Sequence, residues 1–344
     1  MNSNVTTKRP VGHKRSYYAG IMLVFFLLLS ISIVASLVFG SRSVTLEDLM
    51  AGLLASSSDS YTAAVVHERI PRTLFSLLCG GALGVSGALM QAVTRNPLAD
   101  PSILGVNTGA SLFVVIGIAY FNISAAGHYI WLSILGAVLT AIIVYGIGSM
   151  GRTGNTPLKL VLAGAATSAI LSSLISAIML PRSFVMDQFR FWQVGSVGAA
   201  NWDYILIFLP FLAAGILLAI ILAPSLNALL LGDEIATGQG VRTGLLTFTA
   251  AFTGVILCGA VTALAGPIGF IGLLATHLMR LIFGPDLRFI IPMSAISGAA
   301  ILTIADVLGR LIGSPGEVEA GIITAFIGAP VLIILATRLK VKAL

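Results

Sequence analysis

Long apolar runs separated by short polar segments follow one another along almost the whole chain. A helix of about 20 apolar residues crosses the roughly 30 Å hydrocarbon core of a bilayer. We expect ten membrane-spanning helices, at 19–40, 69–93, 101–121, 129–149, 158–180, 203–223, 243–265, 269–283, 288–312 and 318–337. The pattern predicts an all-α polytopic membrane protein, with a polar N-terminal segment at 1–18 and one transmembrane domain at 19–340.

The basic residues predict the orientation of these helices. An even number of spans places both termini on the same side of the membrane. Of the 19 Lys and Arg residues, 13 fall on the side of the termini, and the other six are Arg42, Arg69, Arg72, Arg182, Arg190 and Arg310. Because cytoplasmic loops carry an excess of Lys and Arg, both termini are predicted to be cytoplasmic.

Composition supports the membrane assignment and excludes several functions. Hydrophobic residues make up 57% of the chain and charged residues only 9%, against about 25% charged in soluble domains. The longest segments between spans, 41–68, 181–202 and 224–242, are too short for an independent folded domain. If transport uses ATP, the nucleotide site therefore lies on another chain. The cations lie at the ends of apolar runs, which argues against nucleic-acid binding.

The sequence contains no recognisable catalytic or metal-binding cluster. Cys79 and Cys258 lie inside apolar runs, and the four histidines are scattered along the chain, so we predict neither a disulfide nor a metal site. The glycine-rich stretch at 80–87, GGALGVSG, has no preceding strand and no following lysine. It is typical of close helix packing rather than of a phosphate loop.

The stretch LNALLLGDEIATGQGV at 226–241 holds an adjacent acidic pair, Asp233–Glu234, between two apolar runs. Its glycines predict two short helices with tight turns rather than one continuous helix. An ordinary solvated connector is one interpretation. The other is a docking element, with Leu229, Leu230 and Leu231 as an apolar contact and the acidic pair available to basic groups or a helix N-terminus.

Two further groups of polar residues admit two interpretations each. TRNPLADPSILG at 94–105 predicts a kinked cytoplasmic turn, which can be structural or can border a transport pathway. Arg69, Arg72 and Arg310 lie at outer span ends, where arginines either anchor helices at the interface or receive an acidic partner. Asp306 precedes Arg310 by four residues, so the two are expected to form an ion pair on one helix face.

Several motifs together resemble one family. They are RIPRTL at 69–74, GALMQAVTRNPLADPSILGVNTGAS at 87–111, the stretch at 226–241, GPIGFIGL from 266 with His277 and Arg280, AD..GR at 305–310 and GIITAFIGAP at 321–330. They are similar to permease subunits of the FecCD/vitamin-B12 type, which belong to ATP-binding-cassette importers of iron siderophores, haem and cobalamin. The resemblance covers about residues 19–340, and DQFRFWQVGS at 187–196 looks most like permeases for ferric catecholates of the enterobactin type.

The resemblance implies a type II importer permease in the bacterial cytoplasmic membrane, with no catalytic residues and no cofactor of its own. It implies a second permease subunit, identical or similar, two ATPase subunits that bind ATP and Mg, and an extracytoplasmic substrate-binding protein. It assigns three sets of residues: ATPase coupling to Leu229, Leu230, Gly232, Asp233, Glu234, Ala236 and Gly240; binding-protein docking to Arg69, Arg72 and Arg310; and the cytoplasmic turn and pathway to Arg95, Asn96, Pro97 and Leu98.

The sequence also allows two other interpretations. A haem or cobalamin permease of the same family is one alternative. The other is an ion-coupled secondary transporter, which usually needs ionisable groups near the middle of the membrane. Asp306 is the main candidate for such a group, and it lies towards a span end. The chain departs from the family pattern at Thr276, where the family usually has proline.

Overall fold

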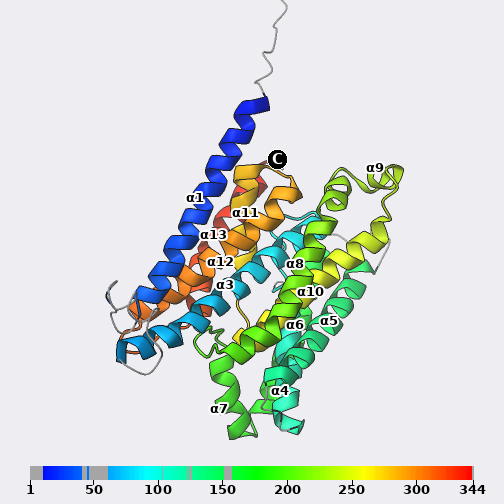
Figure 1. Cartoon of the computed structure of the whole chain (residues 1–344). Coiled ribbons are helices and arrows are strands. Elements are labelled where there is room, and N and C mark those ends of the chain that lie inside the picture. The colour runs from blue at the N-terminus through cyan, green and yellow to red at the C-terminus, as the bar shows by residue number, and fades with distance from the viewer. Residues whose placement is uncertain are drawn as a thin grey trace, which may run out of the picture.

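The computed structural model describes residues 11–40, 45, 61–102, 104–121, 123, 126–150 and 157–342. Within these residues it contains twelve α-helices and no strand (Figure 1). They are α1 (Val11–Val38), α3 (Tyr61–Thr94), α4 (Val106–Phe121), α5 (Ala126–Ser149), α6 (Pro157–Met179), α7 (Ser183–Trp192), α8 (Trp202–Leu230), α9 (Asp233–Gly238), α10 (Thr243–Ala265), α11 (Ile271–Phe283), α12 (Leu287–Ile312) and α13 (Ala320–Lys342).

Each of the ten predicted spans corresponds to one apolar helix, which confirms the fold class. Seven of these helices are long and apolar enough to cross a membrane, while α4, α11 and the apolar part of α13 are shorter. Figure 1 shows the start of α1, the end of α13 and α9 at one end of the molecule, with α7 at the other. We call these the inner end and the outer end, since the distribution of basic residues predicts cytoplasmic termini.

The largest difference from prediction concerns the stretch at 226–241. Its first part is not a separate short helix, because α8 continues without a break to Leu230. No glycine interrupts that part, and Asn227 fixes it to the start of α12. The Asn227 side chain donates to Asp286 Oδ1 at 2.6 Å and accepts from the Leu287 backbone N–H at 2.8 Å. Only α9 is a separate short helix, and left-handed Gly232 and Gly240 flank it.

Helix α3 packs against α1, α8, α10, α11 and α12. Glycine makes its closest approaches possible, as the sequence predicted. A methyl group added at Gly84 would collide with the carbonyl oxygen of Ser294 on α12, and one added at Gly87 would collide with Gly272 on α11. Small residues at such crossings bring helix backbones close together, which is how helices associate in lipid without a hydrophobic driving force.

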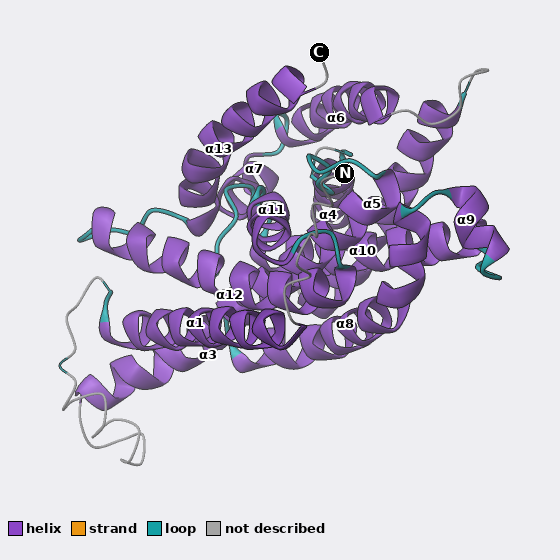
Figure 2. Cartoon of the chain, turned by 90° about the horizontal axis from the view of Figure 1, so that it is seen from above, coloured by secondary structure: helices purple, strands orange, loops and turns teal. Residues whose placement is uncertain are grey.

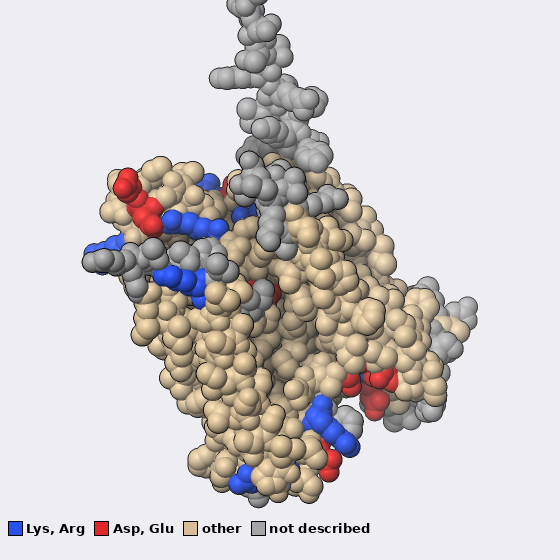
Figure 3. Space-filling model, turned by 180° about the vertical axis from the view of Figure 1, so that it is seen from behind, with Lys and Arg blue, Asp and Glu red and all other residues tan. Residues whose placement is uncertain are grey.

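The outer surface of the bundle matches a membrane environment. Figure 2 shows α1 and α3 along one side of the molecule and α6 and α13 along the opposite side. Large apolar side chains are exposed on α1, α5, α6 and α8. On the face shown in Figure 3, most charged side chains lie near one end or the other, and the band between them is almost entirely uncharged.

We predict that Gly84→Ala destabilises the protein. The added methyl group has no space against the backbone of α12, and overpacking of this kind costs about 1–3 kcal/mol. Gly20→Ala on α1 is the matched control, because nothing lies within 4 Å of a methyl group added there. Thermal unfolding in detergent should show a lower midpoint for Gly84→Ala alone. Equal midpoints for the two variants would contradict the packing described for α3.

Candidate functional site

Helix α9 is an exposed polar element at the inner end. Asp233 and Glu234 occupy its first turn, where negative charge is favourable near the helix N-terminus. Leu231 and Ile235 are exposed large apolar residues beside them. These four side chains together form a surface with both apolar and acidic character, which we call the α9 surface.

The residues to which the resemblance assigned ATPase coupling differ in how exposed they are. Leu229 and Ala236 are buried within the chain, and Leu230 packs partly against the core. Gly232 and Gly240 adopt positive φ values of 121° and 81° and shape the turns around α9. Only the acidic pair of the predicted set offers exposed side chains. Leu231 and Ile235, rather than Leu229, are the apolar groups that a partner can reach.

The turn between α3 and α4 reaches α9 through a charged contact. Arg95 donates from Nη2 to Asp233 Oδ1 at 2.7 Å, and both side chains are partly exposed. Arg95 has a φ of 50°, which is uncommon for a residue other than glycine. The Asn96 side-chain oxygen accepts a hydrogen bond from the Leu98 backbone N–H at 3.0 Å. Pro97 lies between these two residues in the chain. The predicted turn residues therefore form one compact turn beside α9.

Asp100, which the sequence analysis did not single out, connects this turn to the middle of the protein. Its side chain is buried and accepts from the Ser102 backbone N–H at 2.9 Å and the Leu273 backbone N–H at 3.2 Å. Helix α11 has 13 residues, about 20 Å, and so begins inside the hydrocarbon thickness. The carboxylate supplies an acceptor to its first turn, where N–H groups lack intrahelical partners. No sequence signal links Asp100 to Leu273.

Charged residues at the outer end form a second cluster around Asp306. Arg310 pairs with Asp306 at 3.0 Å, as the four-residue spacing predicted. Arg72 on α3 binds the same carboxylate at 2.7 Å and also binds Glu317 at 2.8 Å. These two contacts of Arg72 were not predicted, because they join residues 234 and 245 positions apart.

The arginines of this cluster also hold the end of α1. Arg69 donates to the carbonyl oxygens of Leu37 and Val38 at 2.8 and 2.9 Å. Arg310 donates to the carbonyl oxygens of Ser36 and Phe39 at 3.1 and 3.0 Å. The last carbonyl groups of a helix lack intrahelical donors, and basic side chains satisfy them. Arg69 and Arg310 are 8% and 2% exposed, so their direct contacts in this chain are structural, and their docking role stays a prediction.

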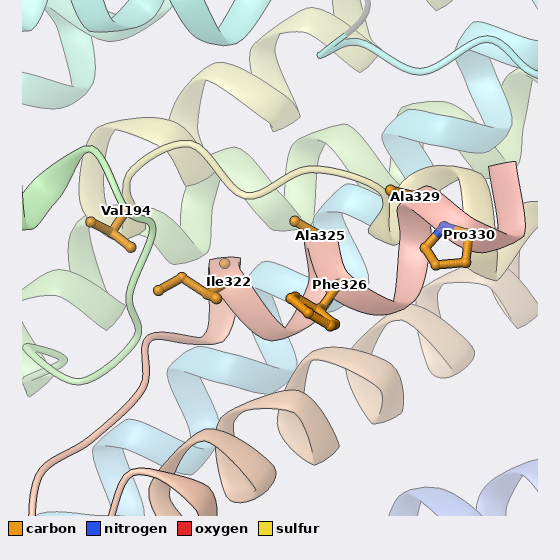
Figure 4. A pocket seen from close by; sticks show the side chains of 7 residues that line it. Val194, Ile322, Ala325, Phe326, Ala329 and Pro330 are labelled. Carbon is orange, nitrogen blue, oxygen red and sulfur yellow. The ribbon is translucent and has the colours of Figure 1, made fainter. Parts of the chain in front are cut away.

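An apolar groove of about 550 Å³ lies along α13 (Figure 4). Its lining residues come from the segment after α7 and from α13: Val194, Gly321, Ile322, Ala325, Phe326, Ala329 and Pro330. Phe326 is 82% exposed. The groove has almost no polar groups, so it can contact apolar or aromatic parts of a solute but offers no charged ligand.

Metal-binding clusters are absent from the part of the chain that the structure describes: it has no group of three or more His, Cys, Asp or Glu residues able to hold an ion. Both cysteines are buried and unpaired with each other. Asp187 and Arg190 on α7 form an exposed pair at 3.6 Å.

Ten apolar helices, an uncharged groove along α13 and an exposed α9 surface with apolar and acidic side chains describe a multi-span membrane protein. Two solved structures share this architecture. One is a metal-chelate type ABC transporter in an inward-facing conformation, with 28% identity, a TM-score of 0.80, and coverage of 93% of this chain and all of that one. The other, PsaBC from Streptococcus pneumoniae in complex with Fab, has 16% identity, a TM-score of 0.60 and coverage of 84% and 95%, and shows the fold alone.

The model of the FecCD transport family matches residues 28–338, and the chain belongs to this family. Among similar proteins, the ferric enterobactin permease FepD of Escherichia coli is 42% identical, with 91% of this chain and 93% of that protein covered. The iron(3+)-hydroxamate permease FhuB of Bacillus subtilis is 39% identical, with 94% and 85% covered. The Fe(3+)-citrate permease YfmD of the same organism is 39% identical, with 92% of each covered.

We predict that Asp306→Ala strongly destabilises the protein. The substitution leaves Arg72 and Arg310 without the carboxylate that they share, and breaking a buried ion pair costs about 3–5 kcal/mol. Asp187→Ala removes the acid of an exposed pair and should cost at most about 1 kcal/mol. Unfolding of the two purified variants in detergent compares these losses. Similar losses would show that Asp306 does not organise the outer cluster.

Proposed function

We propose that this chain is the permease subunit of an ATP-binding-cassette importer that moves a ferric siderophore across the cytoplasmic membrane of a bacterium. Family membership over residues 28–338 carries this proposal. Three relatives at about 40% identity, named above, are permeases for iron chelates. The alternative of an ion-coupled secondary transporter is less well supported, because Asp100 and Asp306 both have structural partners that account for their burial.

Within this class we propose a ferric catecholate as the substrate. The stretch at 187–196 resembles catecholate permeases, and the ferric enterobactin permease is among the relatives. The apolar groove along α13, with exposed Phe326, is compatible with the aromatic rings of a catecholate. Overall identity does not distinguish the substrates, since the hydroxamate and citrate permeases are nearly as similar. Haem and cobalamin remain the alternatives within the family.

The proposed assembly contains a second permease subunit, two ATPase subunits and one extracytoplasmic binding protein, with membrane lipid around the permeases. The α9 surface supports ATPase docking, because exposed Leu231 and Ile235 offer apolar contact and Glu234 offers charge. For the binding protein, Arg72 is the most accessible of the three predicted arginines and already binds a carboxylate, Glu317. ATP binding and hydrolysis on the partner would shift the permease pair between access states.

The proposed substrate is tested by uptake in cells that lack this gene. The panel consists of radiolabelled ferric catecholate, ferric hydroxamate, ferric citrate, haem and cobalamin. We expect selective loss of catecholate uptake and its recovery on complementation. Selective loss of uptake of another chelate would show that the protein is an importer for that chelate rather than for a catecholate. Normal uptake of all five, in cells without a redundant system, would overturn the proposed function.

Phe326→Ala should lower the uptake of the chelate several-fold, because it removes the largest exposed apolar group of the groove. The matched control is Phe248→Ala on α10, which removes an exposed phenylalanine outside the groove. Uptake is measured at equal membrane abundance of the two variants. An equal effect of both substitutions would argue against contact between the groove and the substrate.

Glu234→Lys should reduce co-purification of the ATPase subunits with the permease while leaving its abundance in the membrane unchanged. The reversed charge lies on the α9 surface, and Glu234 makes no ion pair within the described residues. Asp203→Lys makes the same charge change on an exposed residue at the outer end, at the start of α8. Equal co-purification of the ATPase with Glu234→Lys and with wild type would show that α9 is not part of the docking site.

A further inference from the structure

The turn at 95–102, which we call the inner turn, contacts two elements that lie far from it in sequence. At one end Arg95 binds Asp233 of α9. At the other end Asp100 binds the first turn of α11 through the Leu273 backbone N–H. The inner turn therefore connects the helix that faces the ATPase in the proposed function with a helix that begins inside the membrane.

The inner turn has internal contacts that make it a compact unit. The Ala99 backbone N–H donates to the Asn96 carbonyl oxygen at 3.1 Å, and Asn96 also accepts from Leu98. Asp100 binds both the backbone N–H and the hydroxyl group of Ser102. Pro97 and Pro101 fix two further φ angles. These contacts connect the Arg95 end of the inner turn to its Asp100 end.

The far end of this connection reaches the groove. Phe270 precedes the first residue of α11, and its side chain packs against Gly328 of α13. Gly328 lies between Phe326 and Ala329, two of the residues that line the groove (Figure 4). Helices α11 and α13 are also in contact elsewhere. A series of contacts thus runs from α9 through Arg95, Asp100 and the start of α11 to the wall of the groove.

Helix α9 has few other attachments to the membrane helices. It contacts α8 and α10, which flank it in the chain. Within the described residues, the pair with Arg95 is its one ion pair. Because these residues are partly exposed, the pair adds little to overall stability. It is a direct side-chain contact between the inner turn and α9.

We propose that Arg95 and Asp100 are positioning residues for transport: through the inner turn they make the start of α11 and the groove follow the displacement of α9. This inference rests on the proposed function, because it assumes that an ATPase moves α9. It adds a route within this chain from the ATPase-facing surface to the groove. Removal of the Arg95 side of the pair should leave ATP hydrolysis in place and lower the number of chelate molecules moved per ATP. Asp233 also belongs to the α9 surface, so its substitution is judged by this ratio alone.

The experiment measures chelate molecules transported per ATP hydrolysed by the assembled transporter in proteoliposomes. Arg95→Gln and Asp233→Asn should each lower this ratio about two- to fivefold, the range expected for a partly exposed ion pair. The double variant should be no worse than the more affected single variant, because one interaction is lost in all three. Arg95→Lys keeps the charge and should retain most of the ratio.

Arg288→Gln is the control, because Arg288 is an exposed cation at the inner end that forms no ion pair in the described parts of the chain. An unchanged ratio in Arg95→Gln, or independent and additive losses in the double variant, would overturn the inference. Failure of the proposed function gives a different result, since wild-type proteoliposomes would then show no ATP-dependent uptake of any chelate. The ratio also separates coupling from docking, because weaker ATPase binding lowers hydrolysis and transport together.

Discussion

Hydrocarbon offers no hydrogen bonds, so backbone polar groups and charges within the membrane are costly unless the protein itself supplies their partners. This constraint explains the two buried carboxylates. Asp100 binds the first turn of α11, whose N–H groups would otherwise lack acceptors at that depth. Asp306 binds Arg72 and Arg310. Arg310 also donates hydrogen bonds to carbonyl oxygens at the end of α1. Each of these two carboxylates is bound by a group from another element of the bundle.

Close helix packing and these polar contacts act together. Gly84 and Gly87 allow the backbone of α3 to approach α12 and α11. That approach brings Arg72 of α3 within reach of Asp306 on α12. A bulkier residue at either crossing would separate the helices and weaken the ion pair as well as the packing. Small residues in the middle of α3 therefore position charged residues near its outer end.

The two proposed contact surfaces are the α9 surface and the groove along α13. Both lie outside the packed interior of the bundle. The α9 surface projects beyond the bundle at the inner end, so its acidic and apolar side chains remain available to a partner. The groove along α13 lacks charged groups and presents Phe326. Between them lies a polar connection through the inner turn, which is partly exposed at Arg95 and buried at Asp100. In the proposed assembly the energy source is on a different subunit, so the permease needs such a connection.

The sequence by itself determined the ten apolar helices, because the length and hydropathy of each run are local properties that bilayer thickness constrains directly. It also predicted the Asp306–Arg310 pair and the glycine turns around α9, since helical spacing and glycine conformation are local too. Tertiary structure alone decided that Leu229 is buried, that Arg72 shares Asp306, and that Arg95 meets Asp233 from 138 residues away. Those contacts depend on how helices cross and on their relative depth, which residue spacing within one segment does not specify.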